Sequence, residues 1–261
     1  IGEVQETADL IDWYCDQMEA NEGFDRALPD DPLPHFRSHN RTVLRPYGVW
    51  AVIAPFNFPF ALAGGPLGPA LIAGNTAGFK VSPETSLSGR LLLDVLHDAG
   101  LPAGVINFVT GGDATGRALV EHPGVAGITF TGSQAVGLQV LRQSVQGRHP
   151  RPCIVEMGGK NATIVSRHAD LERAALGIVR SAFGLSGQKC SACSRVYVER
   201  PVADALRERL ARLAGELSVG DPTQQAHWMG PVIGRGAYER YARLAEHLAR
   251  VGRIDAGGQW L

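Results

Sequence analysis

Short apolar runs alternate with helix-length amphipathic segments through the middle of this sequence. The runs predict strands at residues 49–53, 77–81, 105–109, 126–130 and 153–157. The segments between them carry apolar residues at helical spacing, at residues 62–72, 87–99, 114–121 and 135–145. Strands and helices alternating at these lengths predict right-handed βαβ units. We therefore expect an α/β fold with a doubly wound parallel sheet covered on both faces.

A second alternating block follows and indicates a second domain, with the boundary near Met157. It carries predicted strands at 163–165 and 195–198 and predicted helices at 171–183, 202–217 and 237–251. Before the boundary lie an opening helix (3–18), a polar connection (21–35) and an extended arm or hairpin (36–47). We expect residues 1–157 to form the doubly wound domain and residues 158–261 to form part of a second α/β domain.

The charge balance and composition exclude several classes of partner. The 25 basic and 26 acidic residues are interspersed, so no basic surface is available for a nucleic acid. No apolar run approaches the roughly 20 residues that a membrane-spanning helix needs, and no signal peptide is visible after Ile1. Four cysteines among 261 residues are too few for a disulfide scaffold, which favours a reducing compartment, the cytoplasm.

A glycine-rich segment, GGDATG at 111–116, lies where a doubly wound sheet binds its ligands. It follows a predicted strand and begins a helix, at the carboxyl end of the strand. It departs from the G-x-G-x-x-G spacing because Asp113 stands at the third position, and it lacks the lysine of a P-loop. On its own the segment is compatible with a dinucleotide loop or with a simple glycine-rich turn.

Only three of the 25 basic residues are lysines, namely Lys80, Lys160 and Lys189. A lysine retained among so many arginines suggests that an ammonium group is specifically required. Lys189 precedes a C-x-x-C pair, Cys190 and Cys193. A zinc site would need a second ligand pair at metal spacing, which the sequence lacks. A redox dithiol and a nucleophilic cysteine both remain open, and the adjoining cation favours Cys190 as a thiolate nucleophile.

Two further residues stand at the ends of predicted strands. Glu156 follows Cys153, Ile154 and Val155, and a carboxylate in an apolar setting is suited to general-base chemistry. Asn57 lies between Phe56 and Phe58, and its amide could donate to an oxyanion or serve only a turn. A capping or ion-pairing role is the structural alternative for Glu156.

Taken together, these segments resemble the aldehyde dehydrogenase superfamily. The resemblance rests on APFNFP (54–59), FKVS (79–82), FTGS (130–133), EMGGKN (156–161) and GQKCSACSR (187–195), in the family's order and spacing. The last of these, with SAFG at 181–184 and MGPVI at 229–233, is most similar to the 1-pyrroline-5-carboxylate (glutamate semialdehyde) dehydrogenase branch. The resemblance covers essentially the whole chain.

The resemblance implies a mechanism with three protein groups. Cys190 would attack the aldehyde, Asn57 and the Cys190 backbone N–H would hold the oxyanion, and hydride would pass to a nicotinamide. Glu156 would then activate water to hydrolyse the thioester. The implied reaction is oxidation of L-glutamate γ-semialdehyde to L-glutamate in proline catabolism, with Phe58, Lys189 and Ser191 binding the substrate.

The resemblance also implies that residues 1–157 form a Rossmann-like domain for NAD or NADP, without any metal. Lys80 and Ser82 would contact the adenosine ribose, and Gly132 and Ser133 the pyrophosphate. The full implied set is Ile53, Ala54, Pro55, Phe56, Lys80, Ser82, Glu84, Gly112, Phe130, Thr131, Gly132, Ser133, Met157 and Gly158. Many family members carry a ribose-binding Glu where this sequence has Pro83, with Glu84 one position later. The resemblance therefore leaves NAD preferred and NADP open.

Chains of this family continue well past residues 256–258. We therefore expect this chain to be a fragment that lacks the rest of the catalytic domain and the second part of an oligomerisation arm. The full-length protein is expected to form a homo-oligomer, a dimer or larger. Two alternatives stay open: a family member with another aldehyde substrate, and an inactive nucleotide-binding remnant.

Overall fold

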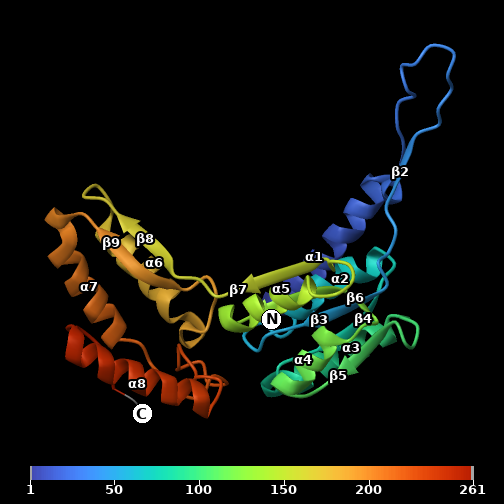
Figure 1. The fold of residues 1–261 in the computed structure, drawn as a ribbon. Coiled ribbons are helices and arrows are strands. Elements are labelled where there is room, and N and C mark those ends of the chain that lie inside the picture. The colour runs from blue at the N-terminus through green and yellow to red at the C-terminus, as the bar shows by residue number, and fades with distance from the viewer. Residues whose placement is uncertain (1, 260–261) are drawn as a thin grey trace. The chain divides into compact units, whose positions relative to one another are not determined.

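A five-stranded parallel sheet of order β5-β4-β3-β6-β7 forms the centre of the first part of the chain (Figure 1). Its strands are β3 (Val49–Ile53), β4 (Thr76–Lys80), β5 (Ile106–Val109), β6 (Val125–Gly132) and β7 (Cys153–Met157). Strand β3 pairs with β4 on one side and with β6 on the other, in parallel register. Since strand order reverses at this point, β3 and β6 form the switch between the two halves of the sheet.

Helices cover both faces of this sheet, as the alternating pattern predicts. Helices α2 (Ala61–Ile72) and α3 (Ser86–Asp98) contribute Leu67 and Leu92 to a core cluster that contains Val52 and Phe79. Helices α4 (Asp113–Glu121) and α5 (Gln134–Ser144) contribute Val120 and Val140 to a second cluster on the opposite face. Successive residues of β3 point to opposite faces and belong to different clusters, Val52 to the first and Ile53 to the second. The sheet is therefore buried on both sides.

The computed structural model describes residues 2–259 and divides the chain into two compact units, Ile1–Met157 and Gly158–Leu261. Within the first unit, helix α1 (Gly2–Ala20) packs along α2. The contact is close because α2 presents glycine: a Cβ atom on Gly64 would lie 2.3 Å from Cγ2 of Thr7. No helix among residues 2–259 is long and apolar enough to cross a membrane.

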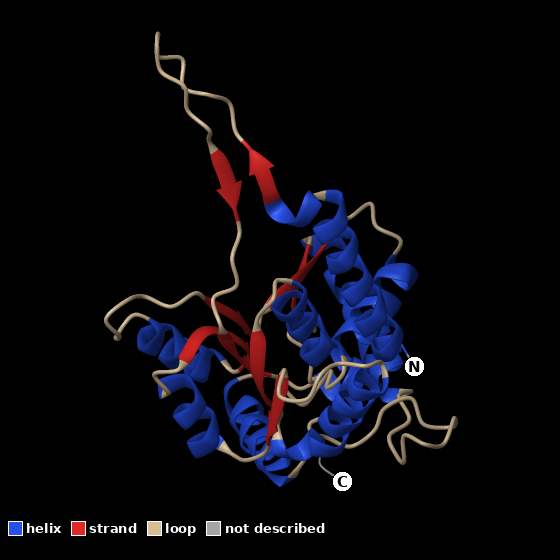
Figure 2. Ribbon diagram, turned by 90° about the vertical axis from the view of Figure 1, so that its right-hand side faces the viewer, coloured by secondary structure: helices blue, strands red, loops and turns tan. Residues whose placement is uncertain are grey.

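An antiparallel hairpin of β1 (Asp25–Ala27) and β2 (Arg41–Val43) carries a long loop away from the sheet of the first unit (Figures 1 and 2). A short 3-10 helix, Glu22–Phe24, precedes it. The sequence predicted the arm at 36–47 and a plain connection over 21–35, so the first strand lies inside the predicted connection. Its pairing depends on a partner 16 residues away, including an ion pair between Asp25 and Arg41, and no local pattern reveals such a contact.

The second unit contains a parallel pair of strands, β8 (Asn161–Val165) and β9 (Cys193–Val198), and three longer helices. These helices are α6 (Leu171–Phe183), α7 (Ala203–Gly215) and α8 (Arg235–Val251). Val165, Ala175, Cys193 and Leu206 form its core, which joins both strands to α6 and α7. Three further 3-10 helices lie at Pro83–Thr85 in the first unit and at Gly184–Gly187 and Arg200–Val202 in the second.

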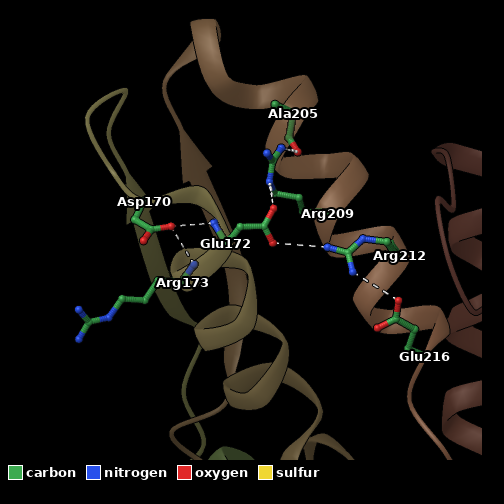
Figure 3. A network of polar contacts seen from close by, with 7 residues as sticks. All are labelled: Asp170, Glu172, Arg173, Ala205, Arg209, Arg212 and Glu216. Atoms are coloured by element: carbon green, nitrogen blue, oxygen red, sulfur yellow. Dashed lines mark hydrogen bonds and ion pairs between the residues drawn. The ribbon is translucent and has the colours of Figure 1, made fainter.

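Polar contacts at the start of α6 tie this helix to α7 (Figure 3). The Asp170 carboxylate accepts the backbone N–H groups of Glu172 and Arg173 and so caps the helix. The Glu172 carboxylate accepts from Arg209 at 2.6 Å and from Arg212 at 3.4 Å, both on α7. Each exposed ion pair stabilises the fold by less than about 1 kcal/mol, so the apolar core carries most of this packing.

Candidate functional site

The carboxyl ends of the five parallel strands lie along one edge of the first unit's sheet. Four of the implied cofactor residues are buried here: Ile53 and Ala54 at the end of β3, Lys80 at the end of β4, and Phe130 near the end of β6. The others are half-buried or exposed at the same strand ends and helix starts, namely Pro55, Phe56, Ser82, Glu84, Gly112, Thr131, Gly132, Ser133 and Met157. The structure therefore gathers this set, whereas Gly158 begins the second unit.

Lys80 is the charged residue most deeply placed at this edge. It ends β4 with 7% of its surface exposed. A Cβ atom on Gly116 would lie 3.8 Å from the Lys80 Cε, so the lysine stem lies against α4. Burial lowers the pKa of Lys80 below its ordinary value, while the negative charge of Asp113 opposes this shift. Asp113, which breaks the glycine-rich fingerprint, is therefore the charge partner of Lys80.

Two helices begin at the same edge of the sheet. Helix α4 starts after Gly112, which has no side chain to cap it. Helix α5 starts after Ser133, whose Oγ accepts the Val136 backbone N–H at 3.4 Å. The N-terminal end of a helix carries partial positive charge and unpaired N–H groups, which makes both starts suitable neighbours for an anion.

Asn57 and Glu156 also belong to the first unit, at the ends of β3 and β7. Asn57 is half-buried between Phe56 and Phe58. Glu156 is exposed, because the alternation along β7 turns Val155 and Met157 toward the other face and leaves Ile154 beside it. The apolar residues adjacent in sequence therefore do not enclose this carboxylate within its own unit, in contrast to the sequence-based expectation.

Cys190 lies in a four-residue turn of the second unit, between α6 and β9. The Ala192 backbone N–H closes the turn on the Lys189 carbonyl at 3.3 Å, which places Cys190 at the second position. The N–H of that position does not make the turn's own hydrogen bond. The Cys190 side chain is exposed, and Ser191 beside it is exposed as well.

The other cysteines are less accessible than Cys190. Cys193 is 8% exposed and belongs to the core of the second unit, where its Sγ lies 3.2 Å from Oγ1 of Thr163. Cys15 and Cys153 are half-buried, and burial raises the pKa of the Cys153 thiol. Among the four thiols, Cys190 is therefore the most exposed to a reagent in solution.

An unusual backbone segment precedes the Cys190 turn. Leu185, Ser186 and Gly187 have φ values of 54°, 57° and 71°. These values lie in the left-handed region of backbone conformation, which residues other than glycine rarely adopt. Contacts with a distant segment of the same unit hold this conformation. The Ser186 Oγ donates to the Gly230 carbonyl at 2.7 Å, and the Ile233 N–H donates to Oε1 of Gln188 at 2.8 Å.

Lys189 lies between this segment and Cys190, and its ammonium group turns back. A Cβ atom on Gly184 would lie 3.1 Å from the Lys189 Nζ, so the ammonium lies against the C-cap residue that follows α6. A cation is favourable at the C-terminal end of a helix. The structure thus gives Lys189 a local role that the sequence did not reveal.

A family model described as "Aldehyde dehydrogenase family" matches residues 1–260, and the chain belongs to that family. Among curated relatives, a 1-pyrroline-5-carboxylate dehydrogenase of Geobacillus thermodenitrificans is 41% identical over 99% of this chain. The match covers 50% of that relative, so the chain spans about half the length of the curated relatives it matches.

Solved structures of the same fold agree with this assignment. Proline utilization A of Bradyrhizobium japonicum matches 98% of this chain and 26% of its own, with a TM-score of 0.92 and 34% identity. PnpE in complex with nicotinamide adenine dinucleotide matches 98% of this chain and 52% of its own, with a TM-score of 0.89 and 32% identity. The family and the second structure together support a nicotinamide cofactor.

The residues at the sheet edge suit such a cofactor chemically. The buried Lys80 ammonium can donate to ribose hydroxyl groups, and the starts of α4 and α5 can face a pyrophosphate. The half-buried Pro55 and Phe56 supply apolar surface for a planar ring.

We predict that Lys80→Met does not weaken the fold and raises its stability by about 1 kcal/mol, because the wild type buries a charge. The folded-state pKa of Lys80 lies below its ordinary 10.5, so between the two values the unfolded chain binds more protons. Below both pKa values the charged Lys80 lowers the stability of the folded state by its whole burial cost. This cost disappears as the pH rises from the folded-state pKa to the unfolded-state pKa. Wild-type stability should therefore rise toward that of Lys80→Met as the pH rises from the lowered folded-state pKa toward 10.5.

Denaturant unfolding at a series of pH values measures this difference. Taking wild type minus variant cancels the Cys153 thiol, which titrates in both proteins. Arg117→Met, an exposed cation of α4, is the matched control and should show no pH-dependent difference. A Lys80→Met protein less stable than wild type at every pH would contradict the assignment of a burial cost.

Proposed function

We propose that the full-length protein is an NAD(P)-dependent aldehyde dehydrogenase that uses Cys190 as its nucleophile. One observation carries the proposal: Cys190 is an exposed thiol in a turn, while Cys193, three residues away, is packed in the core. The sequence left two interpretations of this cysteine pair open, a redox dithiol and a single nucleophile. The difference in exposure between the two thiols supports the nucleophile. Family membership supports the reaction class.

The proposed reaction assigns one task to each protein group. The Cys190 thiolate forms a C–S bond to the aldehyde carbon, and the carbonyl electron pair moves onto oxygen. The Asn57 amide and the Cys190 backbone N–H donate to that oxyanion. A bound nicotinamide would supply the acceptor for the hydride that leaves the carbon. Glu156 then takes a proton from water as the water attacks the thioester, which releases the carboxylate and the thiol.

Residues of the first unit would hold the cofactor. Lys80, Ser82 and Glu84 lie near the end of β4, where they would meet the adenosine ribose, and Gly112, Gly132 and Ser133 lie at helix starts suited to phosphate. The ammonium of Lys80 accommodates ribose hydroxyls and a 2′-phosphate alike, although Asp113 beside it favours the uncharged ribose of NAD. We propose NAD as the preferred cofactor, with NADP as the alternative.

We further propose that the substrate is L-glutamate γ-semialdehyde. The names of the curated relatives support this choice, and so does the chemistry of the Cys190 turn. The substrate carries a carboxylate and an ammonium some atoms from its aldehyde, and Lys189 and Ser191 flank the nucleophile. Phe58, next to Asn57, would supply an apolar wall.

The proposal extends to assembly and compartment. The arm of the first unit exposes large apolar residues, Leu28, Leu33, Phe36 and Leu44, which supports a homo-oligomer of the full-length protein. All four cysteines are free thiols, which supports a reducing compartment such as the cytoplasm.

Cys190→Ala in the full-length protein should lower turnover by about a thousandfold or more, because none of the other three cysteines is an exposed thiol in this turn. Dinucleotide binding should remain. Cys193→Ala is the matched control and should retain the chemistry with some loss of stability. Alkylation mapping of the wild type should label Cys190 first, and preferential labelling of Cys193 would overturn the proposal.

Glu156→Gln should spare hydride transfer and slow thioester hydrolysis by about 10²–10⁴-fold, because the amide cannot accept the proton of water. Stopped-flow absorbance should show a burst of reduced cofactor followed by a slow steady state. If the burst itself is lost while the cofactor still binds, Glu156 acts before hydrolysis.

Lys189→Met should lower kcat/KM for glutamate semialdehyde by about 10-fold or more and spare an uncharged aldehyde of similar length, if Lys189 binds the substrate carboxylate. The comparison is informative because the Lys189 ammonium also lies at the end of α6. Equal losses for both aldehydes would assign Lys189 to the local role alone. A wild-type preference for the uncharged aldehyde would refute the proposed substrate.

A further inference from the structure

We propose that Asn161 is a positioning residue that holds the backbone around Cys190 in its reactive geometry. The proposal rests on Cys190 being the nucleophile, as proposed above. The Asn161 side-chain amide donates to the Cys190 carbonyl at 2.6 Å and to the Ala192 carbonyl at 3.3 Å. One NH2 group thus binds the backbone on both sides of Ser191.

A second observation shows that the segment around Asn161 lies close to the Cys190 turn. A Cβ atom on Gly159 would lie 2.8 Å from the Cys190 carbonyl oxygen, a contact that folded proteins do not show. Only a glycine lets the chain at residue 159 approach the Cys190 backbone so closely. Gly159 and Asn161 therefore contact the same carbonyl, one by close approach and one by a hydrogen bond.

The segment that makes these contacts is itself fixed. Asn161 begins β8 and is the register partner of Cys193, the first residue of β9. The Ser194 Oγ donates to the Asn161 carbonyl at 3.4 Å, and the Cys193 N–H donates to the Ser181 Oγ at 3.2 Å. Cys193 is anchored in the core, so Asn161 connects a rigid strand end to the exposed turn three residues before it.

The Asn161 amide binds two backbone carbonyls, so its effect on the thiol passes through the backbone. The Cys190 carbonyl lies in the peptide plane that follows the Cys190 Cα and the N–H in the plane that precedes it, and the two planes are joined at the Cα that carries the Sγ. A change in their orientation displaces both the Sγ and the N–H proposed to hold the oxyanion. A misplacement of about 1 Å at a reacting group can cost about 100-fold in rate.

The test uses the full-length protein with Asn161→Ala, which removes both hydrogen bonds without adding charge. Asn161→Asp is nearly isosteric but turns an oxygen toward the two carbonyls. Asn107→Ala is the matched control, because the exposed Asn107 amide also donates to a carbonyl, that of Gly104 at 3.0 Å, far along the chain in the first unit. For each variant, kcat, the KM for NAD and aldehyde, the burst rate and the melting temperature are measured.

We expect Asn161→Ala and Asn161→Asp to lower kcat and the burst rate by about 10- to 100-fold, with the KM for NAD within twofold of wild type. Both variants should melt within a few degrees of wild type, and Asn107→Ala should match wild type throughout. Burst rates within twofold of wild type would overturn the proposal. So would losses of rate that follow the loss of melting temperature, since these denote a purely structural residue.

A separate measurement distinguishes failure of the Cys190 assignment from failure of the Asn161 role. Iodoacetamide labelling of Cys190, quantified by peptide mass spectrometry, needs no turnover and should show that the thiol remains present and accessible in the Asn161 and Asn107 variants. If Cys190→Ala keeps wild-type turnover, the nucleophile assignment fails, and with it the role of Asn161. If Cys190→Ala is inactive and the Asn161 variants are fully active, only the positioning role fails.

Discussion

The parallel pairing of β3 with both β4 and β6 is the constraint on which the first unit depends. Because both neighbours run in the same direction as β3, their carboxyl ends meet at one edge. The same pairing buries both faces of β3, so the strand is apolar throughout and polar residues are confined to the segment that follows it. The position of Asn57, Lys80 and Ser133 along one edge is thus a consequence of strand direction.

Local patterns were sufficient to predict most of this fold. β3, β7 and α6 have the bounds expected from their apolar spacing, and the other predicted helices and strands differ at their ends by one or two residues. The arm is the clearest failure. Strand β1 has only three residues, and its existence depends on pairing with Arg41–Val43 across a long loop. A contact of that kind has no periodic signature in a single sequence.

The site was predictable in its residue types and less so in their surroundings. The sequence could not show that alternation along β7 leaves Glu156 exposed, or that the ammonium of Lys189 turns back toward Gly184. It also could not reveal why Asp113 interrupts the glycine-rich segment, because the charge that Asp113 faces, Lys80, is 33 positions earlier in the chain. Side-chain direction and long-range charge pairing follow from tertiary packing, which patterns of neighbouring residues do not record.

The contrast between Cys190 and Cys193 has a consequence beyond catalysis. Two thiols of the same chemistry lie on one short peptide, one exposed in a turn and one held in the core by β9. Cys193 is only 8% exposed, so we expect its labelling to depend on β9 leaving its place against β8, whereas Cys190 is exposed in the folded state. The ratio of labelling at the two positions therefore reports local opening of the second unit, with Cys190 as an internal standard for reagent concentration and exposure time.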